Sequence, residues 1–183
     1  MQARFLLLLP LALPMVFVGA QEPQGAPRVP PPTSDVGSIE GTVAALYNVI
    51  SGPAGPRNWE RFRGLFHPEQ GRLMPVRPQQ GTQKFDVAAW TPADYQERAG
   101  AFFAQNPFYE SELSQRTEQY GHIAHVFSTY ESRTAPDAEP FDRGINSIQM
   151  VHDGVRWWIL SVTWDSESGA GPIPERYLST KKR

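Results

Sequence analysis

The chain has 183 residues, of which 40% are hydrophobic and 20% charged, enough for one globular domain with short appendages. The formal net charge is −2 at pH 7 and the densest basic run is Lys181-Lys182-Arg183, so we do not expect a nucleic acid as a partner. The sequence contains no cysteine, which excludes disulfides and a lipid-modified cysteine.

The first twenty residues have the pattern of a secretory signal peptide. Arg4 gives a short basic start, residues 5–18 are mostly apolar, and Val18-Gly19-Ala20 offers a small-residue cleavage site. The apolar run is shorter than a membrane-spanning helix requires. We therefore expect an exported protein, periplasmic or secreted, with no membrane span after cleavage. Residues 21–37, rich in Pro, Gln and Gly, predict a disordered tether.

Three helices are predicted in the first half of the domain. Apolar residues recur at helical spacing over residues 39–50 and predict the first helix. Asn58 is the expected cap of a short second helix that ends before His67. Thr91 and Asp94, with a proline between them, are typical of a capping box and predict the start of the third helix.

Strands are predicted around and after the third helix. Residues 71–76 indicate a short strand and residues 79–84 a loop. Residues 108–120 and 122–133 then favour two long strands, because they are rich in Thr, Tyr, Phe and Val.

The stretch from residue 143 to 165 predicts a β-hairpin that turns at Asp153-Gly154, a pair favoured in type I′ turns. Counting outward from that turn places Met150 opposite Trp157, and Ile148 opposite Ile159. It also places Asn146 opposite Ser161, and Gly144 opposite Thr163, with Asp165 continuing the same face. This face changes from apolar near the turn to polar far from it, which predicts the wall of a cavity.

The order of elements predicts an α+β fold, in which helices pack on one face of a strongly bent antiparallel sheet. The chain resembles the nuclear transport factor 2-like superfamily, in particular its SnoaL-like branch of secreted bacterial proteins. The resemblance covers residues 38–165. The predicted domain spans residues 38–168 and is followed by a C-terminal tail over residues 169–183. The resemblance is carried by Trp59-Glu60-Arg61-Phe62, Leu65-Phe66-His67-Pro68, Ala124-His125-Val126-Phe127-Ser128, Asp153-Gly154 and Trp157-Trp158-Ile159.

The resemblance implies a cone-shaped barrel with a pocket between helices and sheet, and a homodimer joined through the sheets. Isomerases of this superfamily use a carboxylate as base and a tyrosine or a protonated acid as oxyanion donor. On this basis the candidate catalytic residues are Glu110, His125, Tyr130 and Asp165. The candidate pocket residues are Tyr47, Trp59, Phe62, Phe103, Asn146, Trp157, Ser161 and Thr163.

We expect no metal and no cofactor. His122 and His125 are three residues apart on a predicted strand and therefore point to opposite faces. The first functional hypothesis is a non-catalytic or accessory module that binds a small, largely apolar molecule. The alternative is a cofactor-free isomerase, lyase or hydrolase, and a third hypothesis is a purely structural dimerisation domain. A carboxylate or imidazole in the cavity, within about 3 Å of a second polar group, distinguishes an enzyme.

Overall fold

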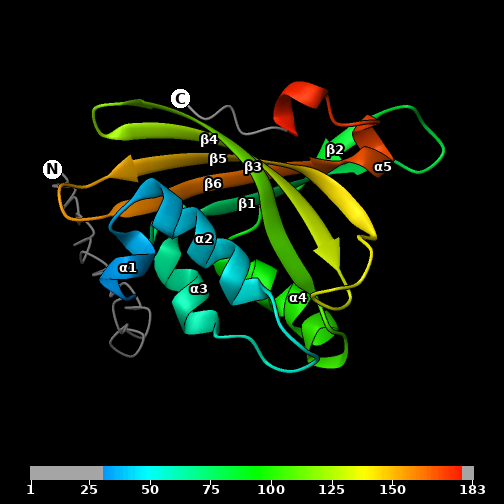
Figure 1. The fold of residues 1–183 in the computed structure, drawn as a ribbon, viewed down its shortest axis with the longest axis horizontal. Coiled ribbons are helices and arrows are strands. Elements are labelled where there is room, and N and C mark those ends of the chain that lie inside the picture. The colour runs from blue at the N-terminus through cyan, green and yellow to red at the C-terminus, as the bar shows by residue number, and fades with distance from the viewer. Residues whose placement is uncertain (1–30, 179–183) are drawn as a thin grey trace, which may run out of the picture.

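A computed structural model describes residues 31–178 of the protein (Figure 1). The predicted signal peptide, most of the predicted tether and residues 179–183 lie outside the described residues. Within residues 31–178, none of the helices has the length and apolarity that crossing a membrane requires.

The three predicted helices are present, and the second and third begin at their predicted caps. They are α2 (Ile39–Ile50), α3 (Trp59–Leu65) and α4 (Pro92–Gln105). Asn58 Oδ1 accepts a hydrogen bond from Arg61 N at 2.9 Å, which caps α3. At α4 the Thr91 side chain and the Asp94 side chain each bond the other residue's backbone nitrogen, forming the predicted capping box. Local sequence therefore determines where these helices start.

Six strands form one sheet in the order β2-β1-β6-β5-β4-β3. Their bounds are β1 Arg72–Pro78, β2 Phe85–Val87, β3 Tyr109–Tyr120, β4 Ile123–Arg133, β5 Asp142–His152 and β6 Trp157–Ser166. The predicted α+β class is confirmed, but two details were wrong. The sheet is mixed, because β1 runs parallel to β6, and it is not closed into a barrel. Strand β2, in a segment next to the predicted loop, was not expected.

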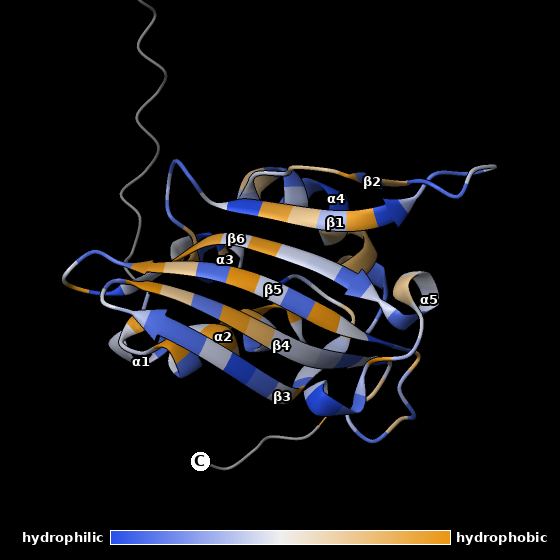
Figure 2. Cartoon of the chain, turned by 90° about the horizontal axis from the view of Figure 1, so that it is seen from above, coloured by the Kyte–Doolittle hydropathy of each residue, from blue (hydrophilic) through white to orange (hydrophobic). Residues whose placement is uncertain are grey.

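The helices cover the concave face of the sheet and enclose the hydrophobic core (Figure 1). Residues of α2 and α3 such as Val43, Phe62 and Leu65 are buried against Ile148 and Ile159 of the sheet. Strand β3 at the sheet edge is mostly hydrophilic (Figure 2), as expected for a strand whose residues 116–120 are exposed to solvent. The core therefore lies under β4, β5 and β6.

The hairpin between β5 and β6 turns one residue later than predicted. Asp153 N donates to Arg156 O at 3.2 Å, so the chain reverses over Gly154 and Val155. A type I′ turn needs positive φ at both central residues, and here only Gly154 has it, at 98°. Asp153 instead accepts the backbone N–H groups of Val155 and Arg156 with Oδ1, both at 2.8 Å. The observed pairs near the turn are therefore Met150 with Ile159 and His152 with Trp157.

A β-bulge at Leu160 changes the register a second time. Beyond it Ile148 pairs with Val162 and Asn146 pairs with Trp164. Because strand side chains alternate with a period of two, one extra residue moves every later side chain of β6 to the other face. The predicted pairs of Asn146 with Ser161 and of Gly144 with Thr163 were therefore wrong.

The packed chain extends beyond the predicted domain at both ends. Thr33–Val36 forms the short helix α1, with Asp35 and Val36 buried, inside the segment expected to be a tether. At the other end, α5 (Glu167–Ala170) and the 3₁₀ turn η1 (Glu175–Tyr177) follow β6. Thr129 Oγ1 donates to Tyr177 O at 2.7 Å, which holds this C-terminal segment against the outer face of the sheet.

Candidate functional site

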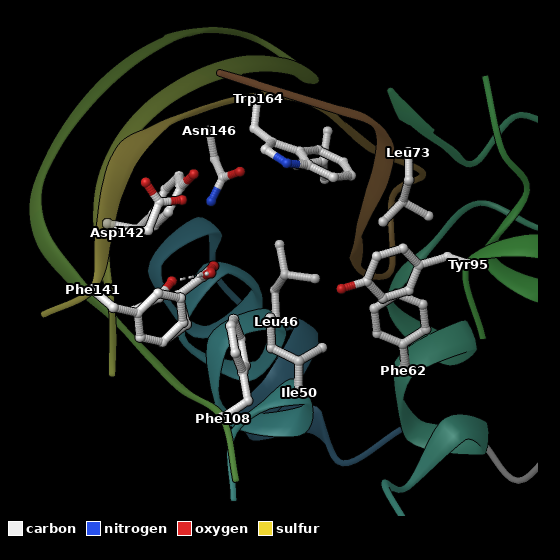
Figure 3. A pocket seen from close by; sticks show the side chains of 14 residues that line it. Leu46, Ile50, Phe62, Leu73, Tyr95, Phe108, Phe141, Asp142, Asn146 and Trp164 are labelled. Atoms are coloured by element: carbon white, nitrogen blue, oxygen red, sulfur yellow. Dashed lines mark hydrogen bonds between the residues drawn. The ribbon is translucent and has the colours of Figure 1, made fainter. Parts of the chain in front are cut away.

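A pocket of about 220 Å³ opens between the helices and the concave face of the sheet (Figure 3). Its apolar walls come from α2, α3, α4, β1 and β6 and from Phe108 and Phe141, and its carboxyl, amide and serine hydroxyl groups come from β3, β4 and β5. The lining residues are Leu46, Ile50, Phe62, Leu73, Tyr95, Phe108, Glu110, Tyr130, Ser132, Phe141, Asp142, Asn146, Val162 and Trp164.

Glu110 is the acid–base candidate of this pocket. One of its carboxylate oxygens accepts a hydrogen bond from Ser132 Oγ at 3.1 Å. Burial disfavours the charged form and raises the pKa of Glu110 from its ordinary 4.5 to about 7. Hydrogen bonds from the Ser132 hydroxyl and the Asn146 amide lower this pKa in part, and the nearby Asp142 carboxyl raises it. Both protonation states of this side chain are therefore populated near neutral pH.

The backbone of Glu110 is tied to the end of α2. Its N–H donates to Ser51 Oγ at 2.9 Å, and the Ser51 hydroxyl in turn lies 3.1 Å from the Glu110 carbonyl oxygen and 2.7 Å from that of Tyr47. Ser51 is the residue at which α2 ends. The helix end therefore fixes the position from which the Glu110 side chain enters the pocket.

Two tyrosines contribute hydroxyl groups to the pocket. The Tyr95 hydroxyl points toward the pocket interior (Figure 3), while its ring stacks on Phe62 at 5.3 Å and meets the edge of Trp164 at 6.4 Å. Tyr130 is buried, and its ring lies over Gly144, where a Cβ would be only 2.5 Å from the Tyr130 oxygen. Burial, with the nearby Glu110 carboxyl, raises the pKa of both tyrosines, so both stay protonated and can donate.

A second carboxyl group, that of Asp142, lines the same pocket beside Phe141, which is 57% exposed at the rim. Burial raises the pKa of Asp142, and the Glu167 carboxylate raises it further. Two nearby carboxyl groups in one pocket disfavour double ionisation, so one of them tends to keep a proton.

Asn146 supplies an amide on the concave face of β5. Its Nδ2 donates to the Tyr47 hydroxyl at 3.0 Å, and that hydroxyl lies 2.7 Å from Ser128 Oγ. The Ser128 hydroxyl donates to a carboxylate oxygen of Glu112 on β3. We call these four side chains the Asn146–Glu112 relay.

The structure brings four of the twelve candidate residues together and separates the others. Glu110, Tyr130, Asn146 and Phe62 line the pocket, whereas Tyr47 lies behind Asn146. The rings of Trp59, Phe103 and Trp157 pack in or against the core and do not line it.

The remaining candidates lie outside the pocket because of strand alternation. His125 faces the outer side of the sheet, where its Nε2 is 3.1 Å from Ser147 Oγ, so it cannot be the base of the pocket. The bulge at Leu160 turns Ser161, Thr163 and Asp165 to the outer face. Thr163 and Asp165 line a separate hollow there, partly covered by the C-terminal segment.

Several pocket residues were missed in the sequence. Asp142 and Ser132 could have been found, because they share strand parity with Asn146 and Tyr130 respectively. Trp164 and Val162 could not, since only the bulge turns them inward. Tyr95 was not among the predicted pocket residues.

Comparison with known proteins gives the fold. No protein-family model matches the sequence, and no curated protein does so either. A protein of unknown function with a cystatin-like fold from Nostoc punctiforme aligns over 70% of this chain and 87% of its own, with a TM-score of 0.54 and 11% identity. A nuclear transport factor 2-like protein of unknown function from Pseudomonas putida aligns over 73% and 87%, with a TM-score of 0.54 and 8% identity.

The fold is the nuclear transport factor 2-like fold. A candidate dehydratase from the nuclear transport factor 2-like family of Streptomyces avermitilis also matches, over 74% of this chain and 97% of that one, with a TM-score of 0.53 and 14% identity. At these identities the likeness describes the architecture, and function has to be argued from the pocket.

Proposed function

We propose that the pocket is the site of a cofactor-free proton transfer on a small, largely apolar molecule, with Glu110 as the acid–base group. The observation that carries the proposal is a carboxyl group with a pKa of about 7 that lines a mostly apolar pocket. A general base is most effective when its pKa lies near the working pH, since it can then both take and return a proton. Glu110 also lies 3.1 Å from a second polar group, Ser132, as the enzyme hypothesis requires.

The two tyrosine hydroxyls suit a substrate with a carbonyl group. If Glu110 removes a proton from the carbon next to the carbonyl, the electron pair of the broken C–H bond moves to the carbonyl oxygen. A hydroxyl of Tyr95 or Tyr130 can stabilise the resulting enolate by donating a hydrogen bond. Return of the proton to another carbon completes an isomerisation, and departure of a β-substituent completes an elimination, so we favour an isomerase or a lyase.

A small chromogenic base probe tests the role of Glu110. Removal of the C3 proton of 5-nitrobenzisoxazole by a base breaks its N–O bond and releases a coloured cyanophenolate. We expect saturable ring opening by the wild-type protein, and a loss of about 10²–10⁴-fold in rate for Glu110→Gln with probe binding, followed by tryptophan fluorescence, nearly unchanged. His125→Asn, which changes the outer face, is the control and should keep the wild-type rate.

The probe also separates the catalytic proposal from a non-catalytic binding module. Binding of the probe without ring opening, or equal ring opening by wild type and Glu110→Gln, overturns the acid–base role. The pocket would then be assigned to ligand binding alone, which was the first hypothesis from the sequence. A protein that binds no apolar probe would contradict both.

We also infer export from the signal-peptide pattern of the first twenty residues. The proposal predicts a mature chain that begins at Gln21 and is found outside the cytoplasm. Mass spectrometry of the N-terminal peptide of the natively produced protein checks this, and an intact N-terminus on most molecules would contradict it.

A further inference from the structure

The Asn146 amide offers an unused hydrogen-bond acceptor to the pocket. The residue is only 6% exposed and its side chain projects into the pocket (Figure 3). Its Nδ2 donates to the Tyr47 hydroxyl at 3.0 Å, whereas Oδ1 has no hydrogen-bond partner among residues 31–178. Among residues 31–178 the one fully buried side-chain polar atom without a partner is Ser114 Oγ, so Asn146 Oδ1 is open to the pocket. A ligand that displaces water from Oδ1 leaves this acceptor unpaired unless the ligand supplies a donor.

The Asn146–Glu112 relay determines the orientation of the Asn146 amide, with Nδ2 toward Tyr47 and Oδ1 toward the pocket. Nδ2 can only donate, so the Tyr47 oxygen accepts and its single proton goes to Ser128 Oγ, 2.7 Å away. The Ser128 proton then goes to the Glu112 carboxylate, which can only accept. If the amide flipped, Oδ1 would face a tyrosine oxygen whose proton is already committed.

We propose that the ligand of this pocket carries a hydroxyl or N–H group opposite Asn146 Oδ1, and that Glu112 acts through Ser128 and Tyr47 as a positioning residue for this selection. A carbonyl oxygen at that place would face another acceptor and leave Oδ1 unpaired. This inference rests on the proposed function for the use of the same pocket. Together with the tyrosine donors, it makes the substrate a hydroxylated, largely apolar carbonyl compound.

A matched pair of probes tests the selection without any need for turnover. 1-Tetralol and 1-tetralone share an apolar body and differ in presenting a donor or only an acceptor. We expect calorimetry to give tighter binding of 1-tetralol to the wild-type protein, by about tenfold or more.

Glu112→Gln tests the relay from outside the pocket, since Glu112 does not line it. A glutamine amide can donate to Ser128 as well as accept from it, so the direction of the relay is no longer imposed. The ratio of the 1-tetralone dissociation constant to that of 1-tetralol should fall several-fold, toward one. Glu118→Gln on the same strand is the matched control, because Glu118 pairs with His125 outside the relay, and it should keep the wild-type preference.

Tyr47→Phe is the second variant, because it removes the hydroxyl partner of the amide and leaves Glu110 as its remaining hydrogen-bond partner, and it should lower the preference in the same way. Its use also keeps the test decisive if Glu112→Gln does not fold, as judged by thermal unfolding. Equal binding of the two probes by the wild type overturns this inference alone. An unchanged preference in both relay variants overturns the positioning role, and binding of neither probe overturns the proposed ligand pocket.

Discussion

Glu110 opposes folding at neutral pH, which fits a residue retained for function rather than for stability. Its pKa is about 7 in the folded protein and 4.5 as an ordinary glutamate, so the folded state binds more protons between these two values. The free energy of unfolding therefore falls as the pH rises from about 4.5 to about 7, and the penalty is constant above that range. A carboxyl group with a purely structural role would be expected to have its pKa lowered by its partners instead.

Glu110→Gln should consequently stabilise the protein at about pH 8, by about 1–3 kcal/mol, because glutamine carries no charge to desolvate. The gain should vanish near pH 4, where Glu110 is protonated in both states. Urea unfolding of the two proteins across this pH range measures the difference. A destabilised variant at pH 8 would identify Glu110 as a structural group.

The same ionisation sets the expected pH dependence of ring opening. The carboxylate form is the base, so the rate for bound probe should rise with pH and reach half its maximum near pH 7. A rate measured from about pH 5 to about pH 8.5 checks this. A half-maximum near the ordinary glutamate pKa would assign the base to a more solvated carboxyl group.

At the scale of elements, α1 is attached by an ion pair that the sequence pattern did not reveal. Arg61 of α3 donates to both carboxylate oxygens of Asp35, at 2.6 and 3.1 Å, and the Asp35 side chain is 10% exposed. Arg61 also donates to Asn48 on α2 at 2.6 Å, so one guanidinium joins three helices. The pair is bidentate and half-buried, the geometry in which ion pairs contribute most.

A double-mutant cycle with Asp35→Asn and Arg61→Met should give a coupling free energy of about 1–2 kcal/mol, measured by urea unfolding. The pair of Arg143 and Glu167 serves as the control, because Arg143 is 41% exposed and solvent screens the interaction. Its cycle should give a coupling below about 0.5 kcal/mol. Equal coupling energies in the two cycles would show that α1 is not held in this way.

The elements were more predictable than their register. Helix starts depend on local residues such as Thr91 and Asp94, and all three predicted starts are present. The hairpin register instead depends on which residue of Asp153-Gly154-Val155 adopts positive φ, and on one extra residue at Leu160. Tertiary packing decides the bulge, so no local pattern exposed it.

At the scale of the whole molecule, the order of the elements and the resemblance predicted the α+β architecture. Counting strand positions predicted the face of a β5 or β6 side chain correctly only where no bulge interrupts the alternation. Asn146 lies before the bulge at Leu160, and the structure has it on the predicted cavity face. Thr163 and Asp165 lie after the bulge and were placed on the wrong face. Glu110 and Tyr130 also line the pocket, but they were predicted as candidates by residue type and not by face. The parallel pairing of β1 with β6 is a long-range contact that the sequence pattern does not encode.

The homodimer through the sheet remains a proposal, and the C-terminal segment limits where it can form. That segment occupies part of the outer face, where Arg116 Nε donates to Arg176 O at 2.9 Å and Ile173 is buried. The uncovered part includes Ile123, which is 60% exposed. We therefore expect a dimer contact around Ile123, because burying exposed apolar surface drives association.

Sedimentation velocity at about 100 µM should give the mass of a dimer for the wild type and of a monomer for Ile123→Glu, since the contact would then bury an unpaired charge. Val155→Glu is the control, because Val155 is 85% exposed at the tip of the β5–β6 hairpin, away from the sheet face. This variant should remain dimeric. A monomeric wild type contradicts the dimer, and a dimeric Ile123→Glu protein moves the contact away from this part of the sheet.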